Sequence, residues 1–372
     1  MSVSSNDAHA HALAPSPFVP GRNCWRTASA SRVAVLIDAA AYFDAVVAAV
    51  ARAQRSVLIL SWDVDSRTTL GGGCSSHRLG EVLHAALERK PRLDVRVLNW
   101  DFALLYVFER ELFAAYRRDW YAHPRMHFRT DGTHPFGASH HQKVVVVDDA
   151  VAFAGGLDIC SRRWDTSSHD PNDPRRVDLA GDPYPPFHDV QIAVDGDAAR
   201  ALGDLARERW RLATGEHLTA TAVRGDPWPR SVTPDFTNVE VAIARTIPAT
   251  REETPAVREV EMLFRDAIRD ARRSIYAENQ YLTWPGVADA LLTRLDEPDG
   301  PEVVLVVPRE GCGWLEEQTM SMRRERVVQR LLAGDRHGRL RILAPVVRGD
   351  VEGGVAVNVH SKVMIVDDTF LR

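Results

Sequence analysis

Short apolar runs alternate with stretches of helical spacing along the first half of the chain. Ser56 to Ser61 (SVLILS) has the length of a buried strand, and Lys143 to Val147 (KVVVV) is a β-branched run. Tyr42 to Arg52 and Leu79 to Arg89 carry apolar residues at helical spacing, and Val95 to Leu98 again resembles a strand. Strands that alternate with helices predict an α/β architecture.

The same alternation starts again after residue 236. The segments are helices predicted at Val257 to Arg272 and Leu315 to Leu332, and strands predicted at Ser274 to Ala277, Val303 to Val307, Leu340 to Leu343 and Lys362 to Val366. His141 lies 85 residues after Ser56, and His360 lies 86 residues after Ser274. This repetition predicts a bilobal fold of two pseudo-symmetric α/β halves with mixed sheets.

The boundaries between the parts of the chain are predicted from its composition. Residues 1–31 form a polar tail, 32–215 the first half, 216–236 a Gly- and Pro-containing linker, and 237–372 the second half. Within the first half, residues 165–187 are rich in Asp and Pro and lack periodicity, which predicts a long loop.

Composition narrows the function classes. The net charge is −5, which argues against a broad nucleic-acid-binding surface. The four cysteines are too scattered for a zinc site or a disulfide framework; they are Cys24, Cys74, Cys160 and Cys312. No signal peptide and no uncharged apolar stretch of membrane-spanning length is recognised, so we expect a cytoplasmic protein, with peripheral binding to membranes as an open alternative.

Lysine is rare in this chain, and its positions are informative. Of 46 basic residues only Lys90, Lys143 and Lys362 are lysine, and the last two each follow a histidine by two positions. Lysine offers a compact point charge where arginine offers a broad planar fork. We therefore interpret Lys143 and Lys362 as sites that require the compact cation.

Two segments share the pattern His-x-Lys, four mostly β-branched residues, and Asp. The members are His141, Lys143 and Asp148 in the first, and His360, Lys362 and Asp367 in the second. On a strand, residues two apart point to the same face, so each histidine and lysine would project together. An imidazole beside an ammonium suits attack on a bound anion. A solvated strand edge would explain one copy but not two at matched spacing.

These motifs resemble the signature of the phospholipase D superfamily, including bacterial phospholipases D and cardiolipin-synthase-like proteins. Three further segments are similar to that family: AFAGGLDICSRRWDTSSH from Ala152, PFHDVQIAVDG from Pro186 and AENQYLT from Ala277. The resemblance runs from about Gly21 to the end of the chain.

The resemblance implies a role for each motif residue. His141 would attack phosphorus and form a phosphohistidine, and His360 would protonate the leaving alcohol and then activate water or an alcohol. Lys143 and Lys362 would bind non-bridging oxygens. No metal and no cofactor is expected in this scheme.

Supporting residues also follow from the resemblance. Asp189 is expected to orient His141 through a hydrogen bond, and Asp148 and Asp367, grouped with the catalytic residues, to anchor the ends of the motif strands. Gly155, Gly156 and Asp158 are expected beside the substrate. Glu278, Asn279 and Gln280 would support the second histidine or, equally, satisfy buried backbone groups.

The family pattern has a Gly-Ser-x-Asn-like segment and an acidic residue after the second motif, and the sequence stops at Arg372. We therefore expect a C-terminal truncation, with an incomplete second half, no strand after Lys362 to Val366, and no carboxylate for His360.

The expected function is phospholipid phosphodiester chemistry: headgroup hydrolysis or phosphatidyl transfer, with water or a small alcohol as acceptor and the substrate at a membrane surface. A cardiolipin-synthase-type transferase, a nuclease-type superfamily member and an inactive scaffold are the alternatives. No nucleic-acid partner is expected.

Overall fold

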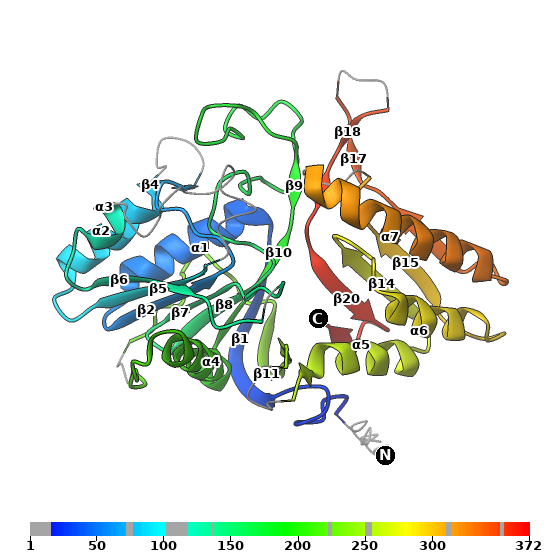
Figure 1. Cartoon of the computed structure of the whole chain (residues 1–372), viewed down its shortest axis with the longest axis horizontal. Coiled ribbons are helices and arrows are strands. Elements are labelled where there is room, and N and C mark those ends of the chain that lie inside the picture. Colours follow the sequence, from blue (N-terminus) through cyan, green and yellow to red (C-terminus); the bar gives the residue numbers. More distant parts are fainter. Residues whose placement is uncertain are drawn as a thin grey trace, which may run out of the picture.

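The computed structural model has two lobes that meet along a central interface (Figure 1). It describes residues 16–71, 77–101, 118–135, 137–221, 225–249, 255–309, 314–349 and 353–372. Of the cysteines, Cys74 and Cys312 lie outside these ranges, while Cys24 and Cys160 are buried free thiols.

The first lobe is built on an eight-stranded mixed sheet in the order β11-β1-β10-β8-β7-β2-β5-β6. Its strands are β1 (Arg26–Ile37), β2 (Ser56–Ser61), β5 (Asp94–Trp100), β6 (Met126–Asp131), β7 (Val144–Val147), β8 (Val151–Gly155), β10 (Val190–Asp195) and β11 (Phe236–Ile243). Its helices are α1 (Asp38–Arg52), α2 (Leu79–Arg89), α3 (Arg118–Tyr121) and α4 (Gly196–Thr214).

Successive side chains of the central strands point to opposite faces of the sheet, so the apolar core of the first lobe has two layers. Val145 and Val147 face the cluster that includes α1 and α2, whereas Val144 and Val146 face the cluster that includes α4. Successive side chains of a strand point to opposite faces, so a strand covered on both sides reads as a continuous apolar run. The runs SVLILS and KVVVV are explained in this way.

The second lobe has a five-stranded mixed sheet in the order β16-β15-β14-β20-β21. Its strands are β14 (Ser274–Asn279), β15 (Glu302–Val306), β16 (Leu340–Leu343), β20 (Lys362–Val366) and β21 (Phe370–Leu371). The helices are α5 (Glu259–Asp270), α6 (Pro285–Leu295) and α7 (Trp314–Gly334), and their apolar residues share one core cluster with β14, β15 and β20.

The two lobes repeat one topology. In the first, β8-β7-β2-β5-β6 follow one another across the sheet, and in the second β21-β20-β14-β15-β16 occupy the same order with the same parallel and antiparallel pairings. The predicted α/β class and the pseudo-symmetric halves are confirmed. The expected boundary at 216–236 stays a prediction; β11, which follows it, pairs with β1 of the first lobe.

The expectation that no strand follows the second motif is wrong. β21 pairs with β20, and Arg372 and Met364 exchange two backbone hydrogen bonds of 2.8 Å. The turn between them resembles the β7–β8 turn: Asp367 and Asp368 have φ of 54° and 56°, and Asp148 and Asp149 have φ of 56° and 53°. Aspartate tolerates this left-handed backbone, which tight hairpins require, so two residues suffice to reverse the chain.

One short strand pair joins the lobes. β9 (Phe187–His188) of the first lobe runs parallel to β19 (Asn358–Val359) of the second, at the centre of the molecule (Figure 1). The remaining short strands are β3 (Thr69–Leu70), β4 (His77–Arg78), β12 (Thr246–Ile247), β13 (Val257–Arg258), β17 (Val346–Val347) and β18 (Val355–Ala356). Among the described residues, no helix is long and apolar enough to cross a bilayer.

Candidate active site

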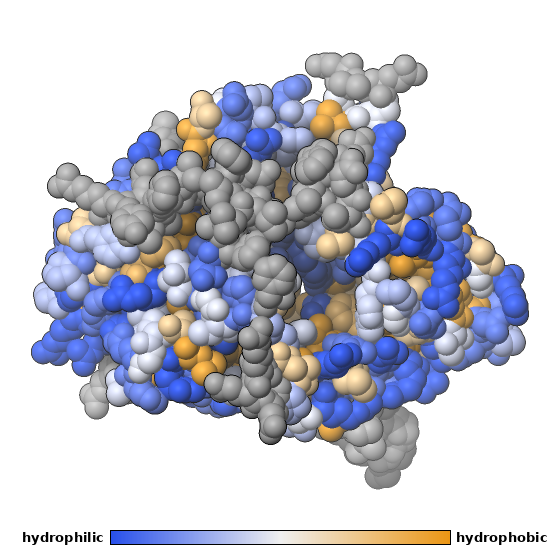
Figure 2. Space-filling view, in the orientation of Figure 1, coloured by the Kyte–Doolittle hydropathy of each residue, from blue (hydrophilic) through white to orange (hydrophobic). Residues whose placement is uncertain are grey.

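The two motif histidines come from equivalent places in the two lobes. His141 precedes β7 and His360 precedes β20. The charge of Lys362 acts on His141 across the interface, so both motifs contribute to one site. On the face shown in Figure 2, the surface is hollowed between the lobes.

Asp189 binds His360, and this corrects the expected pairing with His141. Its Oδ2 lies 2.5 Å from Nδ1 of His360, and the carboxylate is fully buried. The β9–β19 pairing causes this contact, because the backbone N–H of His360 donates to the carbonyl of His188, one residue before Asp189, at 2.8 Å. His360 therefore does not lack a carboxylate: the first lobe supplies it.

The paired glycines have a packing role. A Cβ at Gly156 would lie 2.1 Å from Oδ1 of Asp189, and one at Gly155 would lie 2.5 Å from the carbonyl of Val190. Only glycine lets the backbone approach this closely. The expected contact of Gly155 and Gly156 with substrate stays a prediction. In the structure the two glycines allow Asp189 and β10 to pack closely against the backbone.

His141 has a different environment. Its ring lies 6.0 Å from that of Trp62, and among the described residues no carboxylate is hydrogen-bonded to it. Its pKa is held well below the ordinary value by desolvation and by the charges of Lys143 and Lys362. Because the residue is exposed, the charges carry more weight than the desolvation.

Each motif lysine is held by a neighbour. Nζ of Lys143 is buried and lies 3.0 Å from Oδ2 of Asp158, whose Oδ1 accepts the backbone N–H of Trp62 at 3.0 Å. Nζ of Lys362 donates to Oε1 of Gln280 at 2.7 Å and to the carbonyl of His360 at 2.5 Å. Asp158, expected at the substrate, instead fixes the position of Lys143.

A third cation at the site is Arg163, which sequence reasoning missed. Its positive charge acts on both His141 and His360, and its guanidinium lies 5.0 Å from the ring of Phe187, which packs on His360 at 5.4 Å. Its Nε is buried without a hydrogen-bond partner among the described residues. The signal was present in the segment CSRRWD, but nothing local distinguishes Arg163 from Arg162.

Burial and these cations set the protonation of the central pair. Burial raises the pKa of Asp189 to about 6, and burial together with Lys362 lowers the pKa of His360 well below its ordinary value. Burial also lowers the pKa of Lys362 to about 8, against the opposing charge of Asp189. At neutral pH the site thus holds an ionised Asp189, a neutral His360 and a predominantly charged Lys362.

The chain is similar to a known protein family. The family model described as Phospholipase D matches residues 49–286, which include the first motif, while His360 lies beyond the match. This match covers more than half of the chain. The chain belongs to the phospholipase D family.

Relatives within the family are distant. Phospholipase D alpha 1 of Vigna unguiculata is 29% identical over 194 residues, covering 38% of this chain and 24% of that protein. Phospholipase D C of Dictyostelium discoideum is 28% identical over 218 residues, covering 48% of this chain and 12% of that protein. The chain thus spans a quarter or less of the length of these relatives.

A solved structure supports the phospholipase D fold over nearly the whole chain. The phosphatidylserine synthase of Haemophilus influenzae superimposes with a TM-score of 0.58 at 14% identity, covering 91% of this chain and 77% of that one. At this identity the likeness concerns the fold, and it extends across both lobes.

The aspartates that end the phospholipase D motifs lie away from the histidines, which corrects their grouping with the catalytic residues. Asp148 accepts the backbone N–H groups of Gln54, Arg55 and Ser56 at 2.7 to 2.9 Å. Asp367 does the same for Arg272, Arg273 and Ser274 at 2.7 to 2.8 Å. Each Asp follows its His by seven positions, roughly 20 Å of extended chain, so both anchor strand ends, as expected from the sequence.

Glu278 and Asn279, in the segment AENQYLT of the second lobe, have different contacts. Asn279 accepts the backbone N–H groups of Tyr281 and Leu282 at 3.0 and 2.8 Å, so it satisfies local backbone. Glu278 lies 3.0 Å from Nε2 of His188 and links the lobes next to Asp189. Neither residue hydrogen-bonds the ring of His360 directly.

We expect Asp148→Ala to lower the free energy of unfolding by about 3 kcal/mol, since three backbone donors lose a charged acceptor. Asp367→Ala should cost less, because its site is more exposed. Denaturant unfolding measures both. Activity per folded molecule should stay within about twofold of wild type; a selective loss of activity at unchanged stability would restore the catalytic interpretation.

Proposed function

We propose that this chain carries a phosphodiesterase or phosphatidyltransferase site that acts through a covalent phosphohistidine. The observation that carries the proposal is the placement of two histidines, one from each lobe, in a site with three cations, where only His360 is paired with a buried carboxylate, Asp189. This asymmetry gives the two histidines different chemistry.

His141 suits the nucleophile. A nucleophilic imidazole must be unprotonated, and the neighbouring positive charges keep the pKa of His141 low. No negative charge is hydrogen-bonded to its ring among the described residues, so nothing favours the imidazolium form. The role expected from the resemblance is therefore kept as our proposal.

His360 suits the general acid and base. Asp189 accepts its Nδ1–H, which directs Nε2 into the site and favours the imidazolium when a proton arrives. A phosphodiester anion bound among Lys143, Lys362 and Arg163 would offset their charges and raise the pKa of His360. The substrate would thereby help to create the acid that its own cleavage needs.

The proposed reaction has two steps. In the first, the lone pair of His141 forms a P–N bond, the P–O bond to the leaving alcohol breaks, and His360 gives its proton to the departing oxygen. In the second, water or an alcohol loses its proton to His360 and attacks phosphorus, and the P–N bond breaks. Lys143 and Lys362 bind the non-bridging oxygens in both steps.

We further propose that the substrate is a phospholipid headgroup ester presented at a membrane surface to a cytoplasmic or peripherally bound protein. The names of the curated relatives support phospholipid chemistry, and the lack of a spanning helix among the described residues is compatible with access from the water phase. Hydrolysis and transfer share the covalent intermediate, so the acceptor decides between them.

The test is a headgroup-release assay against vesicles of several phospholipids, with and without a primary alcohol, and against a single-stranded oligonucleotide. We expect release from at least one phospholipid and, with alcohol, a phosphatidyl-alcohol product. Cleavage of the oligonucleotide alone would contradict the lipid assignment, and no turnover of any diester would contradict the enzyme.

Arg163→Gln should lower kcat/KM by about 10- to 100-fold, roughly 1.4 to 2.7 kcal/mol of transition-state stabilisation, because one cation facing the phosphate is lost. Steady-state kinetics on vesicles measures this. Arg162→Gln is the matched control: its guanidinium is exposed and pairs with Asp178 at 3.3 Å. Equal effects of the two variants would remove Arg163 from the phosphate site.

A further inference from the structure

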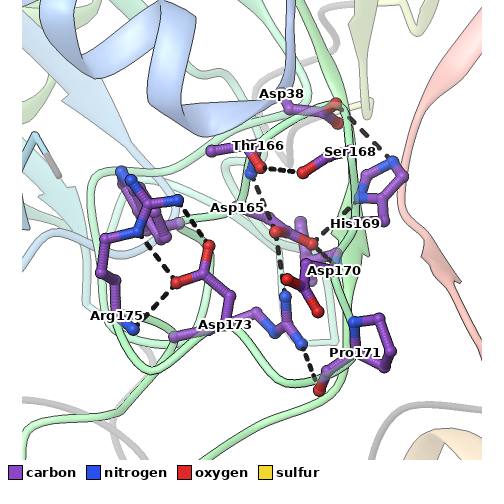
Figure 3. A network of polar contacts seen from close by, with 12 residues as sticks. Asp38, Asp165, Thr166, Ser168, His169, Asp170, Pro171, Asp173 and Arg175 are labelled. Carbon is purple, nitrogen blue, oxygen red and sulfur yellow. Dashed lines mark hydrogen bonds and ion pairs between the residues drawn. The ribbon is translucent and has the colours of Figure 1, made fainter. Parts of the chain in front are cut away.

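A cluster of metal-ligating side chains lies beside the active site and has no part in the reaction above. It consists of Asp38 at the start of α1, His169 in the loop 165–187, and His188 in β9. One donor atom from each lies within 4.8 Å of the other two. Figure 3 shows His169 reaching from the loop towards Asp38, with Asp165 behind it.

His169 is oriented towards Asp38 by a second carboxylate. Its Nδ1 lies 3.0 Å from Oδ2 of Asp165, which is fully buried and also accepts the backbone N–H of Phe187 and a guanidinium N–H of Arg176. A carboxylate with this many donors accepts rather than donates, so Nδ1 carries the hydrogen, and in the neutral imidazole the lone pair is then on Nε2.

The two atoms that face each other are both electron-rich. Nε2 of His169 lies 3.6 Å from Oδ2 of Asp38, which is beyond hydrogen-bond distance. Oδ2 of Asp38 is buried and has no hydrogen-bond partner among the described residues. A buried carboxylate oxygen without a donor is costly, and a cation between the two atoms would satisfy both.

His188 completes the cluster, but its nitrogen towards Asp38 lies within hydrogen-bond distance, unlike that of His169. Its Nε2 lies 3.0 Å from Oε2 of Glu278, and its Nδ1 lies 2.8 Å from Oδ1 of Asp38. Each histidine thus has one carboxylate behind its ring and Asp38 in front. Carboxylates behind the ring are what fix metal-binding histidines in known sites.

We propose that Asp38, His169 and His188 bind a divalent transition-metal ion, Zn²⁺ in the first place, with water in the fourth position. Two histidines and one carboxylate are a common donor set for zinc. Tetrahedral bonds of about 2.0 to 2.1 Å place donor atoms about 3.3 to 3.4 Å apart, close to the separation of His169 and Asp38. On binding, Nδ1 of His188 releases its proton to solvent and gives its lone pair to the ion.

The ion would position catalytic residues without touching substrate. The backbone N–H of Asp38 donates to the carbonyl of Asp189 at 2.8 Å, and Oδ1 of Asp38 accepts the N–H of Asp189 at 3.3 Å. Holding Asp38 and His188 therefore holds Asp189, which orients His360. No metal was expected from the sequence, because residues 38, 169 and 188 come from three separate segments and form no ligand motif.

The test measures metal binding to the tag-free full chain without substrate, so it is independent of the proposed reaction. We expect Zn²⁺ to bind in a metal-buffered titration, Co²⁺ to give visible bands of nitrogen and oxygen ligation, and Zn²⁺ to raise the melting temperature. His169→Gln should weaken Zn²⁺ binding at least about 100-fold and abolish the thermal shift.

His127→Gln is the matched control, because His127 lies 3.7 Å from Asp94 and belongs to no metal-ligand cluster among the described residues. It should bind Zn²⁺ as wild type does. Failure of the wild-type chain to bind either ion would overturn the proposal whatever the variants do. So would undiminished binding to His169→Gln; in both cases His188 would be a proton-bearing link between Asp38 and Glu278 only.

Discussion

His141→Asn is expected to reduce turnover by at least about 10⁴-fold and to leave no covalent phosphoenzyme, because it removes the nitrogen that forms the P–N bond. Asparagine keeps a polar side chain of moderate size at an exposed position, so the fold should be unaffected. Rapid acid-free quenching after mixing with labelled substrate, followed by protein precipitation, measures the covalent label.

His360→Asn separates the two histidine roles. With a nitrophenyl leaving group, which needs little protonation, this variant should still form the phosphoenzyme on His141 but hydrolyse it slowly, since it lacks the base that activates water. Label should therefore accumulate in His360→Asn and be absent in His141→Asn. The opposite pattern would make His360 the nucleophile and His141 the acid.

Asp189→Asn should reduce kcat for an alkyl leaving group by about 10³-fold, because the imidazolium of His360 loses its buried counter-charge. Without the negative charge of Asp189 the pKa of the His360 imidazolium falls. The alkaline limb of the kcat profile should therefore move to lower pH. A nitrophenyl leaving group should recover most of the rate. An equal loss with both leaving groups would contradict a role through the acid.

The melting temperature of Asp189→Asn distinguishes a loss of catalysis from misfolding. Burial raises the pKa of Asp189 to about 6, so the native state binds this proton more tightly than the unfolded state, and the contribution of Asp189 to stability falls as the pH rises from about 4 to 6. At pH 7 Asp189→Asn should therefore melt no lower than wild type. Asp195→Asn at the other end of β10, buried and paired with Arg32 at 2.7 Å, should instead lose stability and keep activity per folded molecule.

Local chemistry explains what could be predicted from the sequence. The strands at Ser56–Ser61 and Lys362–Val366 and the helix at Leu79–Arg89 have the bounds expected from their apolar patterns. Such patterns survive folding because burial of one face or both is what selects the element. Matched spacing of the two motifs likewise predicted the repeated topology, since a duplicated sequence repeats its local preferences.

The prediction for the end of the chain was wrong because a short turn was overlooked. The strand β21 was not expected, because only four residues follow Asp368. The two-aspartate turn with positive φ is enough to bring Phe370 and Leu371 alongside β20. The identical turn after Val147 was the available signal.

Contacts between residues that are distant in the sequence were decided only by the tertiary structure. The sequence by itself determined that two His-Lys pairs lie at the starts of equivalent strands, but not that Asp189 crosses to His360, nor that Arg163 rather than Arg162 faces the histidines. The same holds for Asp38, His169 and His188, whose donor atoms converge from three segments. Periodicity constrains each segment along its own axis, whereas these contacts depend on how two lobes dock through β9 and β19, and docking is decided by the whole folded interface.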